Sequence, residues 1–228
     1  MKRATARGLS AILLGIGVGW GAGNVGPVVE PLASRFHVSL AGVGLLSGTV
    51  YFAAVMVATP LAVPLAARIG VVRSAAVAAA TMAVGHLLFA VSPSFAALLI
   101  ARVLVGVGCA FALIAGPVMA RELGGVRLLG LFGGAITLGI AGALGLGSVL
   151  QDAGVNWRAG FVISAAICVT PLLVLPARLA APPTAPPGPC LHRVGARIGS
   201  RVAPARAVHR RQRGAADHQR LARDVSDA

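Results

Sequence analysis

The chain has 228 residues, of which 57% are hydrophobic and only 11% are charged. Its mean hydropathy is +0.87. A soluble domain of this length does not need so much apolar surface, so the composition excludes one and predicts a membrane protein. Basic residues outnumber acidic ones by 20 to 6, giving a net charge of +14. The three cysteines have a spacing that fits neither a metal site nor a disulfide framework.

The apolar runs predict the number of membrane crossings. A helix needs about 20 apolar residues to cross a bilayer. Six runs come close to this length or exceed it, at 9–33, 41–66, 75–90, 95–120, 128–150 and 160–179. We therefore expect an all-α membrane protein with a six-helix transmembrane domain over residues 9–181, preceded by a short N-terminal segment, 1–8. The first run is too long for a signal-peptide core, and five further runs follow it.

Glycine and proline mark where these helices pack and bend. In the first run, Gly15, Gly19 and Gly23 recur every four residues, which favours close helix packing. Pro27 and Pro31 predict a kink in its second part. The second run holds Pro60 and Pro64 near its end, and a loop at 67–74 follows it. The fifth run carries seven glycines.

The basic residues predict the orientation in the membrane. The N-terminus, the 2–3 loop, the 4–5 loop and the end of the sixth run together hold eight of them: Lys2, Arg3, Arg7, Arg68, Arg73, Arg121, Arg127 and Arg178. The alternate loops hold only Arg35 and Arg158. This asymmetry predicts that both termini are cytoplasmic.

Residues 182–228 differ in character from the rest. Five prolines fall within Pro182–Pro189, where a helix cannot continue. The remainder is basic, without a sustained apolar period, so we expect a disordered cytoplasmic tail. Such a tail is drawn to anionic lipid. It has no aromatic residue to stack on bases, so nucleic-acid binding is not expected. The abrupt change in composition is also what out-of-frame translation of GC-rich DNA produces.

Arg102, in the fourth run, is the most informative single residue. An arginine near the centre of a membrane helix costs about 2.5–3.5 kcal/mol. Arg102 lies about 10 Å inside the span, at helical rise. It therefore either reaches the interface or has a partner inside the protein. Gly106 and Gly108 follow one and two turns further on, where they offer a smooth surface to neighbouring helices.

Two residues of the first run lie at a suitable depth to contact Arg102. Asn24 and Glu30 flank the level of Arg102 by about one helical turn each. Glu30 would neutralise the charge, whereas Asn24 would offer a carbonyl acceptor. The alternative for Glu30 is an interfacial acid just inside the outer loop.

Other polar residues inside the apolar runs are few. Trp20 lies one turn from Asn24, Tyr51 one turn from Ser47, and Thr137 is the one hydroxyl in the middle of the fifth run. The plain role for Trp20 is packing. His86, in the third run, is either a structural histidine or a proton carrier. The chain has no nucleophile–base set, metal cluster or phosphate loop, so we expect neither an enzyme nor a cofactor.

These residues together resemble the N-terminal six-helix half of a major facilitator superfamily transporter. Arg102, Gly106 and Gly108 match the fourth-helix signature of that family. In the 2–3 loop Arg68 and Gly70 match, Arg73 lies one position late, and Ala67 stands where the family has an acid. The remaining matches are partial: the glycine-rich fifth helix at Gly142 and Gly147, and the tryptophan–arginine pair at Trp157-Arg158.

The resemblance implies a secondary active transporter in the cytoplasmic membrane, which moves a small solute by alternating access. It implies that the first and fourth helices line the cavity, with Arg102, Glu30, Asn24, Trp20, Tyr51 and Thr137 as candidates for substrate or coupling. Drug/proton antiport is not supported, because the fifth helix lacks the motif's proline. Proton coupling of another kind stays open, as does the solute.

Length is the main departure from the family. Its members have two such halves, related by an axis along the membrane normal. The second half would come from another copy of the chain or from a separate protein. The alternative is a truncated or frameshifted fragment with no transport activity of its own.

Overall fold

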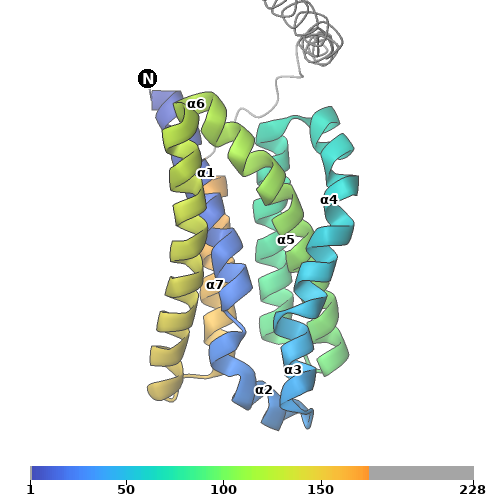
Figure 1. Cartoon of the computed structure of the whole chain (residues 1–228). Helices are drawn as coiled ribbons and strands as arrows, with labels where there is room; N and C mark the ends of the chain where they lie inside the picture. Colours follow the sequence, from blue (N-terminus) through green and yellow to red (C-terminus); the bar gives the residue numbers. More distant parts are fainter. Residues whose placement is uncertain (1, 175–228) are drawn as a thin grey trace, which may run out of the picture. The chain divides into compact units, whose positions relative to one another are not determined.

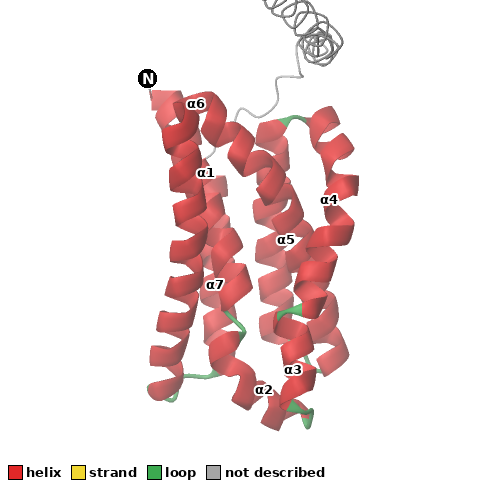
Figure 2. Cartoon of the chain, in the orientation of Figure 1, coloured by secondary structure: helices red, strands yellow, loops and turns green. Residues whose placement is uncertain are grey.

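The computed structural model describes residues 2–174, and side chains from residue 8 onward. Residues 2–174 consist of helices joined by short loops and contain no strand (Figure 2). Its elements are α1 (Lys2–Gly23), η1 (Gly26–Val28), α2 (Val29–Phe36), α3 (Leu40–Ser47), α4 (Thr49–Ile69), α5 (Val71–Val91), α6 (Phe95–Asp152) and α7 (Trp157–Val174). The predicted all-α membrane fold is confirmed. The predicted tail, 182–228, lies outside the described residues.

The longest helix, α6, is folded into two arms. Its 58 residues would extend about 87 Å if straight, nearly three times the hydrocarbon thickness of a bilayer. Gly125 interrupts it with φ 59° and ψ −144°, a conformation that glycine adopts readily. Figure 1 shows α6 bending at one end of the bundle and returning alongside α1. We call residues 95–124 the first arm and residues 126–152 the second arm.

The bend changes the prediction for the fourth and fifth runs. We expected two helices separated by a basic loop near residues 121–127. The structure instead continues the helix through this region, apart from the sharp turn at Gly125. Five helical segments in the described range are long and apolar enough to span a membrane, and α6 is one of them. The predicted count of six crossings therefore stays a prediction, in which the two arms would be separate crossings.

The first run breaks where its prolines predicted a kink. Helix α1 ends at Gly23, and the short 3-10 helix η1 contains Pro27. Helix α2 then resumes and ends at His37, which adopts the left-handed conformation. Asn24 lies in the turn that follows α1, and its N–H still donates to the Trp20 carbonyl. The turn places the Asn24 side chain at the end of a helix rather than in the middle of one.

The second run is also two helices rather than one. Gly48, with φ −106° and ψ −78°, separates α3 from α4. Ser39 caps the start of α3, its side chain accepting from the Gly42 N–H. Pro60 and Pro64 lie within α4 without ending it. The predicted loop at 67–74 was wrong, because Gly70 alone connects α4 to α5, with a φ of 86° that favours glycine.

The buried interior of the bundle lies around the first arm of α6. Its side chains pack with α1, α4 and α5 in one apolar cluster that includes Leu14, Met82, Val105 and Phe111. A second cluster closes one end of the bundle with aromatic rings, including Phe89, Trp157 and Phe161. Helix α4 is mostly exposed. In the most apolar stretch of α3 and α4 together, only 22% is buried inside the protein. Such an apolar surface faces lipid or another membrane helix.

Candidate functional site

Arg102, on the first arm of α6, is completely buried and is held by three neutral groups. Its Nε donates to the Leu46 carbonyl at 3.0 Å, and its Nη1 donates to Asn24 Oδ1 at 3.3 Å. Its guanidinium carbon lies 4.6 Å from the centre of the Tyr51 ring, a cation–π arrangement. Arg102 therefore has an internal partner on the first run, and that partner is Asn24.

The Leu46 carbonyl is available because the helix breaks two residues later. In the described hydrogen bonds around the break, Gly48 N–H donates to Gly44 and Phe52 N–H donates to Gly48. Between these two bonds the regular ladder is interrupted, and the Leu46 carbonyl accepts from Arg102 instead. The break at Gly48 thus supplies one of the acceptors that a buried guanidinium needs.

Asn24 is the centre of a buried hydrogen-bond network. Its Nδ2 lies 3.0 Å from Ser164 Oγ on α7 and 3.3 Å from His86 Nδ1 on α5. Trp20 Nε1 donates to the same Ser164 oxygen at 2.9 Å, and Ser164 donates to the Gly160 carbonyl at 2.7 Å. We call Trp20, Asn24, His86, Arg102 and Ser164 the polar cluster. It joins α1, α5, α6 and α7.

The donors and acceptors of the polar cluster fix the orientation of its groups. The Arg102 guanidinium can only donate, so the Asn24 oxygen must face it. The Asn24 amide nitrogen then faces His86 Nδ1, which must accept. A neutral histidine that accepts at Nδ1 carries its hydrogen on Nε2. Arg102 therefore determines the tautomer of His86 through Asn24.

Two donors of the polar cluster have no acceptor within the described residues. They are His86 Nε2 and Arg102 Nη2, and both are buried. Buried donors are nearly always paired, so each such atom calls for an explanation. Arg102 also has no carboxylate among its contacts in this part of the chain. The cluster is therefore positively charged and short of acceptors.

Glu30, the alternative partner, does not share this environment. It is exposed on α2 and lines an open pocket of about 400 Å³ together with Pro27, Leu40 and Gln151. It forms part of the rim of the bundle rather than its interior. This position agrees with the alternative of an interfacial acid.

The glycines after Arg102 allow two helices to approach the first arm. A Cβ atom on Gly106 would lie 2.8 Å from the Tyr51 carbonyl of α4. A Cβ atom on Gly108 would lie 2.8 Å from the Met82 nitrogen of α5. Both distances are too short for a real contact, so any larger residue would push a helix away. The two glycines therefore allow α4 and α5 to pack closely against the first arm beyond Arg102.

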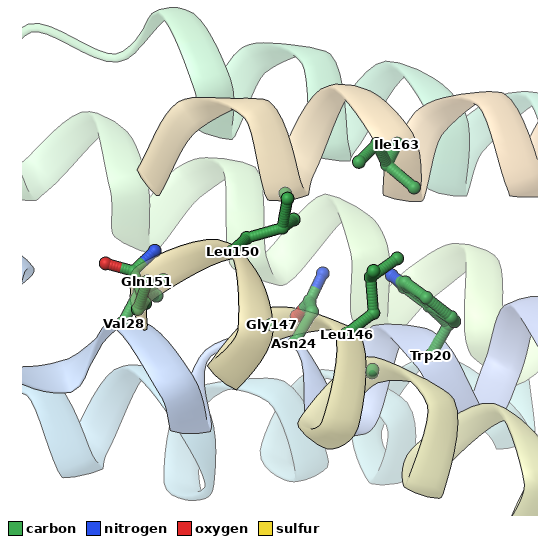
Figure 3. Close-up of a pocket in the computed structure, with 10 residues that line it drawn as sticks. Trp20, Asn24, Val28, Leu146, Gly147, Leu150, Gln151 and Ile163 are labelled. Atoms are coloured by element: carbon green, nitrogen blue, oxygen red, sulfur yellow. The ribbon is translucent and has the colours of Figure 1, made fainter. Parts of the chain in front are cut away.

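The second arm closes the cluster from the side of α1. A Cβ atom on Gly142 would lie 3.0 Å from the Trp20 ring, and one on Gly147 would lie 2.5 Å from Pro27. Between these contacts a cavity of about 20 Å³ remains, which is enough for a water molecule. Figure 3 shows that α1, the second arm and α7 line it, with Trp20, Asn24 and Gln151 among its side chains.

The remaining predicted residues are not part of the cluster. Tyr51 touches it through the Arg102 guanidinium, and its hydroxyl donates to the Val18 carbonyl at 3.4 Å. Ser47 does not share a face with Tyr51, because the break at Gly48 separates them and its hydroxyl donates to Gly44. Thr137 is exposed on the second arm.

The residues of the 2–3 loop motif surround the short connection between α4 and α5. Arg68 lies in the last turn of α4, and Arg73 in the first turn of α5. Between them, the Gly70 carbonyl accepts from both the N–H and the hydroxyl of Ser74. The motif glycine is thus needed for a turn between two membrane helices.

Sequence reasoning missed Ser164 and Leu46 and underrated His86. Ser164 is a hydroxyl within the sixth apolar run, and that position was the one signal that could have singled it out. The role of Leu46 depends on its backbone carbonyl, for which the side chain gives no sign.

Taken together, the helices and the buried arginine define a multi-pass membrane protein built around a polar cluster. The family model of the Major Facilitator Superfamily matches residues 11–212. The chain therefore belongs to the major facilitator superfamily and is a membrane transporter of that type. No curated protein matches its sequence.

Proposed function

We propose that the chain moves a small solute across the cytoplasmic membrane by alternating access, with the polar cluster as its site of substrate binding or coupling. The observation that carries this proposal is Arg102, a charge buried among neutral groups from several helices. Ionisable groups inside membrane proteins are costly and mark substrate or ion pathways. Asn24, Trp20 and Tyr51 belong to this proposed site through their contacts. Glu30 and Thr137 would act only in another conformation.

Two pockets, one near each end of α1, support alternating access. The pocket with Glu30 and Pro27 lies beyond the end of α1, whereas a second pocket, of about 540 Å³, is lined by Gly8 near its beginning and by Arg127. Gly26 follows Gly8 by 18 positions, which corresponds to about 27 Å at helical rise, close to the hydrocarbon thickness of a bilayer. Trp20 and Asn24 lie between the two pockets along α1. A solute site needs such openings on either side.

We also propose that both termini are cytoplasmic. The basic residues Arg68, Arg73, Arg121 and Arg127 support this orientation. The Gly8–Arg127 pocket would then open to the cytoplasm, and the Glu30–Gln151 pocket would open to the outside.

The experiment uses chemical access at the two ends. A cysteine at Gln151 and one at Leu128 report the outer and cytoplasmic pockets, in a background where the three native cysteines are replaced by alanine. A disulfide between Pro27→Cys and Gly147→Cys would lock the outer contact, because a Cβ atom on Gly147 would lie 2.9 Å from the Pro27 Cβ and a small outward shift brings the pair to the separation of about 3.5–4.5 Å found in disulfides. We expect the lock to slow labelling at position 151 and to speed it at position 128. Reducing the disulfide is the matched control.

Unchanged labelling at position 128 in the locked protein would contradict alternating access. It is the result that the alternative, a fragment with no transport activity, predicts. Labelling of position 151 only from the cytoplasmic side would overturn the orientation.

The exposed apolar surface of α4 supports a partner in the membrane. We propose that transport requires a second six-helix unit, either a copy of this chain or a separate half, placed in the same orientation. The mass of the protein in nanodiscs distinguishes the two. A dimer supports the first arrangement, and a monomer contradicts it.

A further inference from the structure

The acidic residues of the described range leave the charge of Arg102 uncompensated. From residue 8 to residue 174 there are three of them, Glu30, Glu122 and Asp152, and all three are exposed. The contacts of Arg102 are a backbone carbonyl, an amide oxygen and an aromatic ring. These groups offer partial charges, but none of them carries a negative charge that would balance the guanidinium in a low-dielectric interior.

The acceptors of the polar cluster are already engaged. The Asn24 oxygen and the Leu46 carbonyl each accept from Arg102. Ser164 Oγ accepts from Trp20 and Asn24 and donates onward to Gly160. What remains is Arg102 Nη2 and the Nε2–H of His86, both buried and unpaired. Within the described residues the cluster therefore has two unpaired donors, one of them on a positively charged group, while each of its acceptor atoms already accepts a hydrogen bond.

We propose that Arg102 and His86, both held in place by Asn24, form a binding site for a small monovalent anion, either a carboxylate or a halide. A bound water molecule would satisfy a donor but would leave the charge unbalanced, whereas an anion does both. The identification of this anion as the transported solute or its co-ion rests on the proposed function. The binding site itself does not.

Arg158 shows what distinguishes Arg102 from an ordinary membrane arginine. Its guanidinium also lies over an aromatic ring, 5.2 Å from the centre of Trp157. It is only half-buried, however, at the start of α7, where water can solvate its charge. The charge of Arg158 is therefore solvated by water beside its aromatic ring, whereas the described contacts of the buried Arg102 do not balance its charge.

The cavities supply a path toward the cluster. The cavity of about 20 Å³ is lined by Asn24 and Trp20, and the open pocket of about 400 Å³ is lined by Glu30 and Pro27. Gln151 lines both of them. An anion entering from the open pocket would thus pass Gln151 to reach Asn24, and the narrow cavity would have to widen as it passes.

The test is equilibrium binding to the full chain in nanodiscs, measured by thermal unfolding. Sodium acetate and sodium chloride are titrated against sodium gluconate, whose anion is much larger than acetate or chloride, at constant ionic strength. We expect acetate, chloride or both to raise the unfolding midpoint, by about 5 °C at a hundredfold excess over Kd. The two arms distinguish a carboxylate site from a halide site.

Asn24→Asp is the deciding variant, because it places a carboxylate against Arg102 Nη1 and so supplies the negative charge that the bound anion would otherwise supply. It should raise the midpoint in gluconate and abolish the response to acetate and chloride. Arg102→Gln should abolish the response as well, and Arg158→Gln should keep it. If Arg102→Gln does not fold, Asn24→Asp still decides, since it preserves the shape of the side chain.

A wild-type protein that responds to neither salt would overturn the proposal, as would an equal response in Asn24→Asp. The access test of the proposed function uses no added anion. Anion binding without a change of access would therefore refute alternating access alone, and a change of access without anion binding would refute the anion site alone.

Discussion

The two arms of α6 belong to one helix, yet they have different surroundings. The first arm is buried on several sides, from Leu98 through Ala120, and it holds Arg102. The second arm is buried along a single stripe, at Phe132, Ala135, Gly139 and Ala143. These positions are three or four residues apart, as on one face of a helix. The first arm is thus the centre of the bundle, whereas the second arm packs through its single stripe along α1.

The comparison shows that glycine content does not by itself indicate close packing. Gly106 and Gly108 on the first arm face neighbouring helices at distances that exclude a Cβ atom. On the second arm, a Cβ atom on Gly130, Gly133 or Gly134 would meet nothing within 4 Å. The second arm is richer in glycine, but only part of its glycines are needed for the contact with α1.

The largest expected effect is at Gly108. Gly108→Val should destabilise the protein by about 3 kcal/mol, because the added carbons overlap the backbone of α5 at Met82. Gly134→Val on the second arm is the matched control and should change the stability by less than about 1 kcal/mol. Thermal or denaturant unfolding in detergent measures both. Equal losses of stability at the two positions would mean that the two arms are equally tightly packed at these glycines.

The bend between the arms gives the next largest effect. Gly125→Ala should cost about 2 kcal/mol, because φ 59° with ψ −144° is strained for any residue with a Cβ atom. Gly130→Ala, in the regular part of the second arm, should stabilise slightly, since alanine favours a helix. A stable Gly125→Ala protein would mean that the arms join in another conformation.

Two substitutions of Tyr51 should separate the contribution of its ring to stability from that of its hydroxyl. Tyr51→Leu removes the ring beneath Arg102 and should cost about 2 kcal/mol. Tyr51→Phe keeps the ring and loses only the 3.4 Å bond to Val18, so it should cost about 0.5–1 kcal/mol. If the two variants were equally unstable, the hydroxyl rather than the ring would support Arg102. Unfolding of both in the same detergent settles this.

The sequence predicted the class of fold well, because apolar runs and basic loops follow directly from the bilayer. It also singled out Arg102 and its two candidate partners from their depth in the membrane. It could not choose between Asn24 and Glu30, because the choice depends on the break after Gly23, which places Asn24 in a turn and moves Glu30 onto a separate helix. The break at Gly48, which frees the Leu46 carbonyl, lay inside an uninterrupted apolar run.

The most direct test of the account is a double-mutant cycle between Arg102 and Asn24. Arg102→Ala, Asn24→Ala and the double variant are unfolded in the same nanodiscs, beside a second cycle with Glu30→Gln. We expect a coupling of about 1–2 kcal/mol for Arg102 with Asn24, since the bond joins a charged and a neutral group inside the membrane. We expect additivity within about 0.5 kcal/mol for Arg102 with Glu30. Additivity in the first cycle, or strong coupling in the second, would contradict it.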